Sequence, residues 1–187
     1  MSKLKLTPGD IAPDFDVFDV QGNHVRLSDY DGSPLLVVFL RYAGCPWCNL
    51  TIHRLTLEYP MLTKQGCKVI AFVQSDTDSI HQQVYGRHVP VPPFPIIADP
   101  QKKIYEQYGV RSSVEAAAKS WRRLPQWATA VREHGFKQGK VDGDLFLVPA
   151  SFLVAPHGQE LIRADHGTSF YDFEALFSIY QSLIFNE

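Results

Sequence analysis

The chain has 187 residues, of which 45% are hydrophobic, 12% aromatic and 20% charged. This composition excludes a disordered chain, a collagen-like chain and a disulfide-dense scaffold. The 18 Lys and Arg and 20 Asp and Glu leave a net charge of −2, and no apolar run approaches the roughly 20 residues of a membrane span. We therefore expect no nucleic-acid partner and no membrane partner. The first ten residues lack the apolar core of a secretory signal, which predicts a cytoplasmic protein.

The first predicted elements form a hairpin followed by a buried strand and a helix. Residues 14–20 alternate polar and apolar side chains, as a half-buried strand does, and a turn at 21–24 leads into a second short strand at 25–27. The apolar run 35–40 predicts a central strand that is buried on both faces. After Cys48, apolar residues recur at helical spacing and predict a long amphipathic helix.

Strands and helices continue to alternate in the middle of the chain, which predicts an α/β fold class with parallel strand pairs. The expected elements are a strand at 67–73, a helix at 79–88, a short extended segment at 94–98 and a helix at 101–108. His81 and His88 lie on the first of these two helices, and we expect both to face solvent.

Residues 111–144 interrupt this alternation of strands and helices, because a helix and the next strand are usually joined by only a few residues. The segment carries seven basic and four acidic residues and two predicted helices that are broken at Pro125. We interpret it as an α-helical insertion and not as a second domain. Trp121 and Trp127 are expected in the core of the insertion or at a subunit contact, and the latter alternative would make the protein a homodimer.

The last predicted elements close the chain. A strand at 149–154 and a strand at 160–164 are expected to form a second hairpin, since a turn-forming Ala-Pro-His-Gly separates them. Residues 170–185 are predicted to form an amphipathic helix with its aromatic and aliphatic side chains turned inward.

Cys45 and Cys48, in the sequence Cys-Pro-Trp-Cys, are the residues that indicate chemistry. A CxxC between a buried strand and a helix in a cytosolic protein is typical of a redox pair. The free N–H groups and the dipole of a helix start favour a thiolate, which is the nucleophilic form. We expect Cys45 to be the more exposed sulfur. Cys48 shares the apolar face of the helix, so we expect it to be the more buried one.

Other interpretations of the cysteines and their neighbours remain open at this point. The pair could be inert or half of a zinc site, but zinc needs two further ligands, so we expect no metal. The sequence has no phosphate loop and no glycine-rich nucleotide motif, and we expect no organic cofactor. Cys67 is expected to be a buried core thiol. Arg41 either lowers a thiol pKa or binds a substrate anion, or it is a solvated arginine. Trp47 either contacts the substrate or is a packed aromatic side chain with no contact to the substrate.

Several of these motifs together resemble the redoxin branch of the thioredoxin superfamily, which includes peroxiredoxins of the alkyl hydroperoxide reductase and thiol-specific antioxidant type. The motifs are Gly-Asp-Ile-Ala-Pro-Asp-Phe at 9–15, the CxxC, and Pro-Ala-Ser-Phe-Leu-Val at 149–154. The resemblance implies one thioredoxin-like domain over 1–187, with an N-terminal β-hairpin and the helical insertion before the late strand hairpin. It also implies a thiol–disulfide oxidoreductase and antioxidant that reduces a peroxide or a disulfide, with thioredoxin or glutathione as its reductant.

The chain departs from the peroxiredoxin pattern Pro-xxx-Thr/Ser-xx-Cys. Aligned on Cys48, that pattern puts Arg41 at the Pro position and Cys45 at the Thr position. The second arginine of the family falls on Pro149, which resembles the cis-proline that faces the CxxC in thioredoxin and glutaredoxin. Comparison with thioredoxin makes Cys45 the nucleophile in disulfide exchange, which we favour. The peroxiredoxin alignment makes it Cys48, with Arg41 as a substitute cation.

Two further alternatives follow from these departures. The first is a thiol–disulfide reductase without peroxidase activity. The second is a non-enzymatic protein with a thioredoxin fold that binds a partner through the insertion. A redox pair that titrates reversibly between about −200 and −270 mV would indicate an exchanger, whereas thiols that stay reduced under oxidant would indicate a binding protein.

Overall fold

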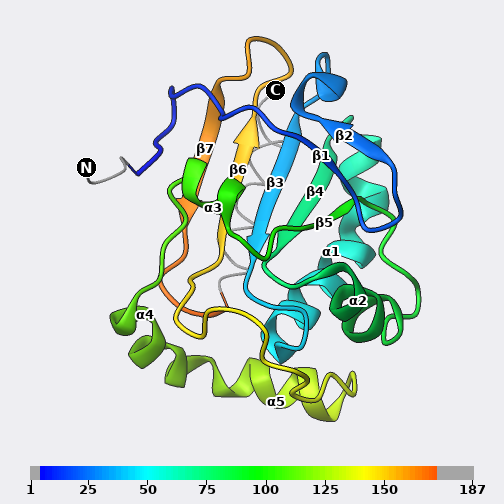
Figure 1. Ribbon diagram of the computed structural model, residues 1–187, viewed down its shortest axis with the longest axis vertical. Helices are drawn as coiled ribbons and strands as arrows, with labels where there is room; N and C mark the ends of the chain where they lie inside the picture. Colours follow the sequence, from blue (N-terminus) through cyan, green and yellow to red (C-terminus); the bar gives the residue numbers. More distant parts are fainter. Residues whose placement is uncertain (1–4, 172–187) are drawn as a thin grey trace.

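A computed structural model of the chain describes residues 5–171. Its centre is a five-stranded sheet with the order β5-β4-β3-β6-β7 (Figure 1). The strands are β3 (Leu35–Leu40), β4 (Lys68–Val73), β5 (Ile96–Ala98), β6 (Ala150–Val154) and β7 (Leu161–His166). β3, β4 and β5 are parallel, whereas β6 is antiparallel to β3 and to β7. β3 lies at the centre and is buried at every position, as its continuous apolar sequence predicts.

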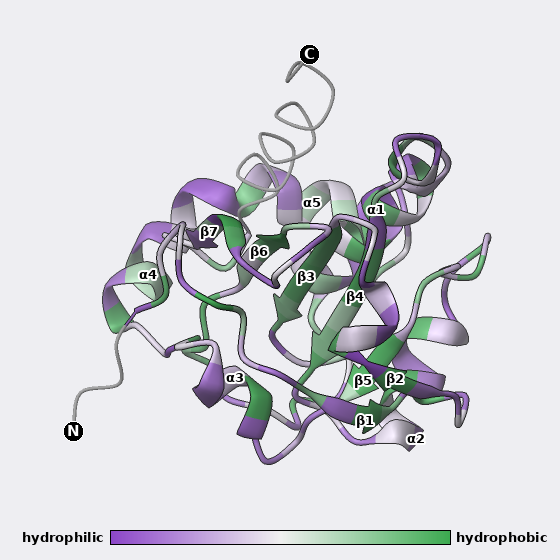
Figure 2. Cartoon of the chain, turned by 90° about the horizontal axis from the view of Figure 1, so that it is seen from above, coloured by the Kyte–Doolittle hydropathy of each residue, from purple (hydrophilic) through white to green (hydrophobic). Residues whose placement is uncertain are grey.

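Helices cover the two faces of this sheet. They are α1 (Pro46–Lys64), α2 (Thr77–Ile80) with a π-helical turn at His81–Tyr85, α3 (Lys103–Gln107), α4 (Val114–Lys119), a 3₁₀ turn at Ser120–Arg123, and α5 (Leu124–Arg132). α1 lies behind the sheet in Figure 1 and α3 in front of it. Figure 2 shows the hydrophobic strands enclosed between these layers. Two separate core clusters result, one on the α1 face and one on the α3 face. Among the described helices, none has the length and apolarity needed to span a bilayer.

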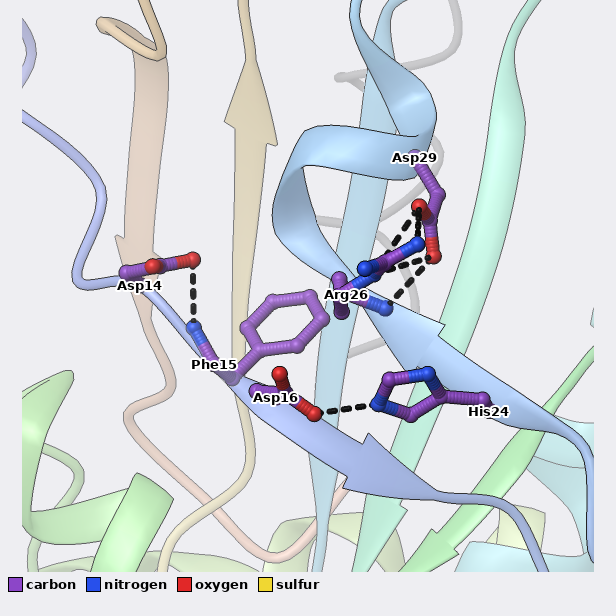
Figure 3. Close-up of polar contacts among 6 residues, drawn as sticks. All are labelled: Asp14, Phe15, Asp16, His24, Arg26 and Asp29. Atoms are coloured by element: carbon purple, nitrogen blue, oxygen red, sulfur yellow. Dashed lines mark hydrogen bonds and ion pairs between the residues drawn. The ribbon is translucent and has the colours of Figure 1, made fainter.

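The predicted N-terminal hairpin is confirmed, and it consists of the antiparallel strands β1 (Asp16–Phe18) and β2 (His24–Arg26). Asp16 on β1 is bonded to His24 on β2, which joins the two strands (Figure 3). Arg26 at the end of β2 pairs with Asp29 in the 3₁₀ turn that follows (Leu27–Tyr30), at 3.1 Å. Phe15 turns inward and is buried edge-on against β4. The hairpin is therefore fixed to the α3 face of the sheet.

The insertion contains the two predicted helices, and the break falls where the sequence places it. α5 begins at Leu124 with Pro125 in its first turn, a position that tolerates the missing N–H of proline. Both helices lie across the end of the sheet at which β3 ends (Figure 1). The closing hairpin is present as β6 and β7. The predicted C-terminal helix at 170–185 lies outside the described residues, apart from its first two positions.

Two predictions about burial are wrong. His88 does not face solvent but is buried, because the helix has ended at Tyr85 and the ring lies against Asn49 of α1. His81 is exposed. Trp121 is not part of a core, since 73% of its surface is exposed, and Trp127 is 37% exposed. The short α4 and α5 do not enclose these rings, and the alternative of a subunit contact stays a prediction.

Candidate active site

The loop that follows β3 places the cysteine pair at the start of α1. Cys45 is the N-cap residue, with extended backbone angles, and Pro46 opens the helix. Cys48 then lies in the first turn and faces the core. The exposed fraction is 0% for Cys45 and 2% for Cys48, so the expectation that Cys45 is exposed is wrong. Both residues are free thiols.

The pKa values of the Cys45 and Cys48 thiols are shifted in opposite directions. Burial acts to raise the pKa of the Cys45 thiol, but the hydrogen bond from the Cys48 thiol, the charge of Arg41 and the N–H groups at the helix start outweigh it. Together they lower the pKa of Cys45 to about 6. Burial and the neighbouring Cys45 sulfur raise the pKa of Cys48 well above its ordinary value. At neutral pH this arrangement holds a thiolate on Cys45 beside a protonated Cys48.

Arg41 is a buried cation at this site, so the alternative of a solvated arginine is wrong. Its Nη1 donates to the Cys45 sulfur at 3.3 Å, and its Nη2 donates to the Leu145 carbonyl at 2.5 Å. The guanidinium carbon lies 3.6 Å from the centroid of the Phe170 ring. Only 2% of the residue is exposed. The guanidinium is thus fixed on three sides, with one nitrogen directed at the sulfur.

A buried amide and imidazole hold the loop that carries Cys45. Asn49 Nδ2 donates to the carbonyls of Ala43 at 2.7 Å and of Cys45 at 3.0 Å. Asn49 Oδ1 lies 2.9 Å from His88 Nε2, which must therefore carry the proton. Burial, and then the positive fields of neighbouring side chains, lower the pKa of His88 to about 3, so the ring is neutral. The sequence interpretation missed both residues, although a polar Asn one turn after Cys45 on a buried helix face was a signal.

Three histidines meet between α1 and the insertion. The ring of His88 stacks on Phe136 at 4.6 Å, and the rings of His53 and His134 lie 4.5 Å apart. Burial and the charge of His134 lower the pKa of His53. No three His, Cys, Asp or Glu side chains within residues 5–171 are arranged to hold a metal ion. The cluster therefore joins the insertion to α1 by packing.

Residues 137–145, which we call the cover segment, lie against the loop that precedes Cys45. Gly139 N donates to the Gly44 carbonyl at 2.8 Å, and Gln138 Nε2 donates to the same oxygen at 3.2 Å. A side chain on Gly44 would overlap the backbone of Lys140. The absence of a Cβ at Gly44 thus permits this close approach.

Further hydrogen bonds fix the remainder of the cover segment. They run from Ser75 Oγ to Asp142 at 2.6 Å, from Asp144 N to Gln74 at 3.0 Å, from Gln74 Nε2 to the Asp144 carbonyl at 3.2 Å, and from Arg41 to Leu145. The partners Arg41, Gln74 and Ser75 directly follow β3 and β4. Cys45 is consequently enclosed by the sheet, α1 and the insertion.

Trp47, between the cysteines, also contacts the insertion. Its Nε1 donates to the Arg123 carbonyl at 3.1 Å, and its ring lies 6.0 Å from that of Phe170. The ring is partly buried. Trp47 therefore packs between α1 and the start of α5, which leaves its predicted contact with substrate as a proposal.

The other two predicted residues lie apart from this network. Pro149 precedes β6, but the implied cis bond is not there, because among the described residues the cis peptide bond is Val89–Pro90. Pro149 lines a separate cavity on the α3 face instead. Cys67 is a buried core thiol, as predicted, and burial raises its pKa to about 12.

Comparison with known proteins shows the family of the chain. The model of the AhpC/TSA family matches residues 8–159. The thiol–disulfide oxidoreductase ResA of Geobacillus thermodenitrificans is 31% identical over 110 residues, which are 58% of this chain and 60% of ResA. A putative peroxiredoxin of Mycobacterium tuberculosis is 27% identical over 131 residues, which are 70% of this chain and 82% of that protein.

Solved structures support the same fold. The crystal structure of peroxidoxin BcpB from Mycobacterium tuberculosis superposes with a TM-score of 0.69 at 14% identity, and the match covers 97% of this chain and 99% of that chain. The predicted thioredoxin-like fold is therefore confirmed. The family match spans most of the sequence and includes the CxxC. The chain belongs to the AhpC/TSA family of thiol-dependent oxidoreductases.

Proposed function

We propose that the protein is a peroxiredoxin-like thiol–disulfide oxidoreductase that cycles Cys45 and Cys48 between dithiol and disulfide. One observation carries this proposal: a buried Arg41 lies 3.3 Å from a sulfur whose pKa is about 6, and a protonated thiol lies three residues further on. The substrate is a disulfide or a peroxide, and thioredoxin or glutathione returns the pair to the dithiol. A reducing compartment such as the cytoplasm suits this cycle.

In disulfide exchange, the Cys45 thiolate attacks one sulfur of the substrate. The substrate S–S bond breaks, a mixed disulfide forms, and the other substrate sulfur leaves as a thiolate that takes up a proton. Cys48 then loses its proton and attacks the Cys45 sulfur. This second step breaks the mixed disulfide, releases the second substrate thiol and forms the Cys45–Cys48 disulfide. Two electrons have passed from the protein to the substrate.

With a hydroperoxide, the same thiolate attacks the terminal oxygen and breaks the O–O bond. The departing oxygen takes up a proton, so the products are an alcohol, or water from hydrogen peroxide, and a sulfenic acid on Cys45. Cys48 condenses with the sulfenic acid and releases water. The guanidinium of Arg41 can stabilise the charge that develops on the departing oxygen, as a substitute for the second arginine of the family, whose position Pro149 occupies.

A second candidate makes Cys48 the attacking sulfur for peroxides. The family match and the alignment of Cys48 with the peroxidatic cysteine favour it. The raised pKa of Cys48 opposes it, because a thiol in that state offers little thiolate. We therefore propose Cys45 as the nucleophile and Cys48 as the resolving cysteine.

We also propose that the insertion controls access to the pair. The cover segment and Phe170 lie against the loop and the guanidinium beside Cys45, whose exposed fraction is 0%. A disulfide substrate needs direct approach to the sulfur, so the cover segment must move before exchange. Trp47 is then freed from α5 and contacts the substrate.

Stopped-flow oxidation of the reduced protein tests the proposal. Hydrogen peroxide, an organic hydroperoxide and a small disulfide are compared as oxidants, with Cys45→Ser as the inactive reference. We expect saturable oxidation by at least one oxidant and a Cys45–Cys48 link in the peptide map, with Cys67 free. Thiols that stay reduced with all three would make the chain a binding protein. If only the disulfide oxidises the protein, the chain is a thiol–disulfide reductase without peroxidase activity.

A further inference from the structure

A second site is formed on the α3 face of the sheet, away from the cysteines. Three basic side chains, Lys5, Arg111 and His166, line a cavity of about 140 Å³. Its apolar walls include the buried side chains of Val110 and Val148. None of the described residues that line it is acidic. The cavity therefore combines an apolar interior with basic groups on its lining, which suits an anion that has an apolar body.

Backbone hydrogen bonds hold the walls together. Val148 N donates to the Arg111 carbonyl at 3.0 Å, and Gly167 N donates to the Pro149 carbonyl at 2.9 Å. A side chain on Gly167 would overlap the Pro149 carbonyl and crowd Val148, so the end of β7 can approach β6 only because Gly167 has none. The cavity is thus formed by fixed backbone and requires little ordering when it is filled.

Within residues 5–171, no carboxylate forms an ion pair with Lys5 or Arg111 at this cavity. Asp165 pairs with Arg163, at 3.5 Å. Because side chains alternate along β7, that pair lies on the opposite side of the strand from His166.

His166 is held at the cavity by two contacts. Its Nε2 lies 3.0 Å from the Leu6 carbonyl, and its ring packs edge-on against Phe152 with centroids 5.2 Å apart. Burial and the charges of Lys5 and Arg111 lower the pKa of His166, against the hydrogen bond to Leu6 and the charge of Asp165, which raise it. Lys5 and Arg111 therefore lie close enough to His166 for their charges to act on the ring.

We propose that this cavity binds the carboxylate of a small organic acid, whose apolar body lies against Val110 and Val148 and whose carboxylate lies at Lys5 and Arg111. Guanidinium groups match carboxylates in a paired geometry. A cavity of ~150 Å³ accommodates benzene, so an acid of the size of benzoate fits. The cysteines belong to the core cluster on the other face of the sheet. The site is consequently separate from the dithiol.

Titration of the full chain with benzoate tests the proposal, with benzyl alcohol as a neutral compound of the same shape. Calorimetry gives the affinity, and the ring resonances of His166 report the place of binding. We expect benzoate to bind and to shift His166 but not the exposed His24. Arg111→Gln and Lys5→Gln should each weaken binding roughly tenfold, the value of a hydrogen bond to a charged group.

Arg122→Gln is the matched control, because it removes an exposed arginine of the insertion that does not line the cavity. It should bind benzoate as the unmodified chain does, and so should Cys45→Ser. The proposal is wrong if benzoate neither releases heat nor shifts His166 at millimolar concentration. It is equally wrong if benzyl alcohol binds as tightly, or if Arg122→Gln weakens binding as much as Arg111→Gln and Lys5→Gln do.

Discussion

Arg41 and Cys45 are joined by a hydrogen bond of 3.3 Å between a guanidinium nitrogen and a sulfur that are both shielded from water. A charge pair in such surroundings interacts more strongly than it would at the surface. The second nitrogen of Arg41 is bonded to the cover segment at Leu145. One side chain thus connects the acidity of the thiol with the segment that encloses it.

Replacing Arg41 with Gln should raise the apparent pKa of Cys45 from about 6 toward the free value of ~8.5, because the stabilising charge is lost while burial persists. The ultraviolet absorbance of the thiolate, followed against pH, measures this pKa. Arg132→Gln, in the last turn of α5, is the control and should leave the curve in place. An unchanged pKa in Arg41→Gln would show that the helix start and Cys48 suffice to ionise Cys45.

His88 should make the protein less stable in acid. Its pKa is about 3 in the folded protein and 6.5 for an unperturbed histidine. Between these pH values the unfolded chain therefore binds a proton at His88 that the folded chain does not bind. This contribution to stability is present above pH 6.5 and is lost as the pH falls toward 3. The free energy of unfolding should then fall by up to ~1.4 kcal/mol per pH unit in this window.

Urea unfolding between those pH values measures the slope, and His88→Gln should flatten it even though it lowers stability at neutral pH by disturbing the bond to Asn49. His24→Gln removes an exposed histidine of the β1–β2 hairpin and serves as the control. Equal slopes in His88→Gln and in the unmodified chain would contradict the assignment of a neutral buried imidazole.

Gly44→Ala should loosen the cover segment, because the added methyl group would overlap the backbone of Lys140. Loss of the bonds to Gln138 and Gly139 should speed the reaction of Cys45 with iodoacetamide roughly tenfold, as expected for about 1.4 kcal/mol. Cys67 is the internal control, since the cover segment does not contact it. If the rate at Cys45 does not change, the cover segment does not limit access.

Much of the fold was predictable from local sequence. The apolar run of β3, the CxxC at the start of α1 and Pro125 at the break in the insertion each have short-range signals that determine one structure. The two short helices of the insertion were also predicted. The family match then supports the identity that these motifs suggested.

The burial of the site could not be predicted in this way. Cys45 has the sequence of an exposed nucleophile, and it is enclosed because residues 137–145, almost a hundred positions later, fold onto Gly44. His88 is buried for the same kind of reason, since its partners Asn49 and Phe136 lie in distant parts of the chain. A single sequence shows which residues can bond but not which distant segment covers them.

The most direct test of the account compares Cys45→Ser and Cys48→Ser by iodoacetamide reaction rate against pH. Cys48→Ser should keep a fast thiol at position 45 with an apparent pKa below ~8.5, because Arg41 still donates to the sulfur and the serine hydroxyl can donate in place of the Cys48 thiol. Cys45→Ser should react slowly at neutral pH, because Cys48 stays protonated in its buried position. A fast, acidic thiol in Cys45→Ser together with a slow one in Cys48→Ser would contradict the account and make Cys48 the nucleophile.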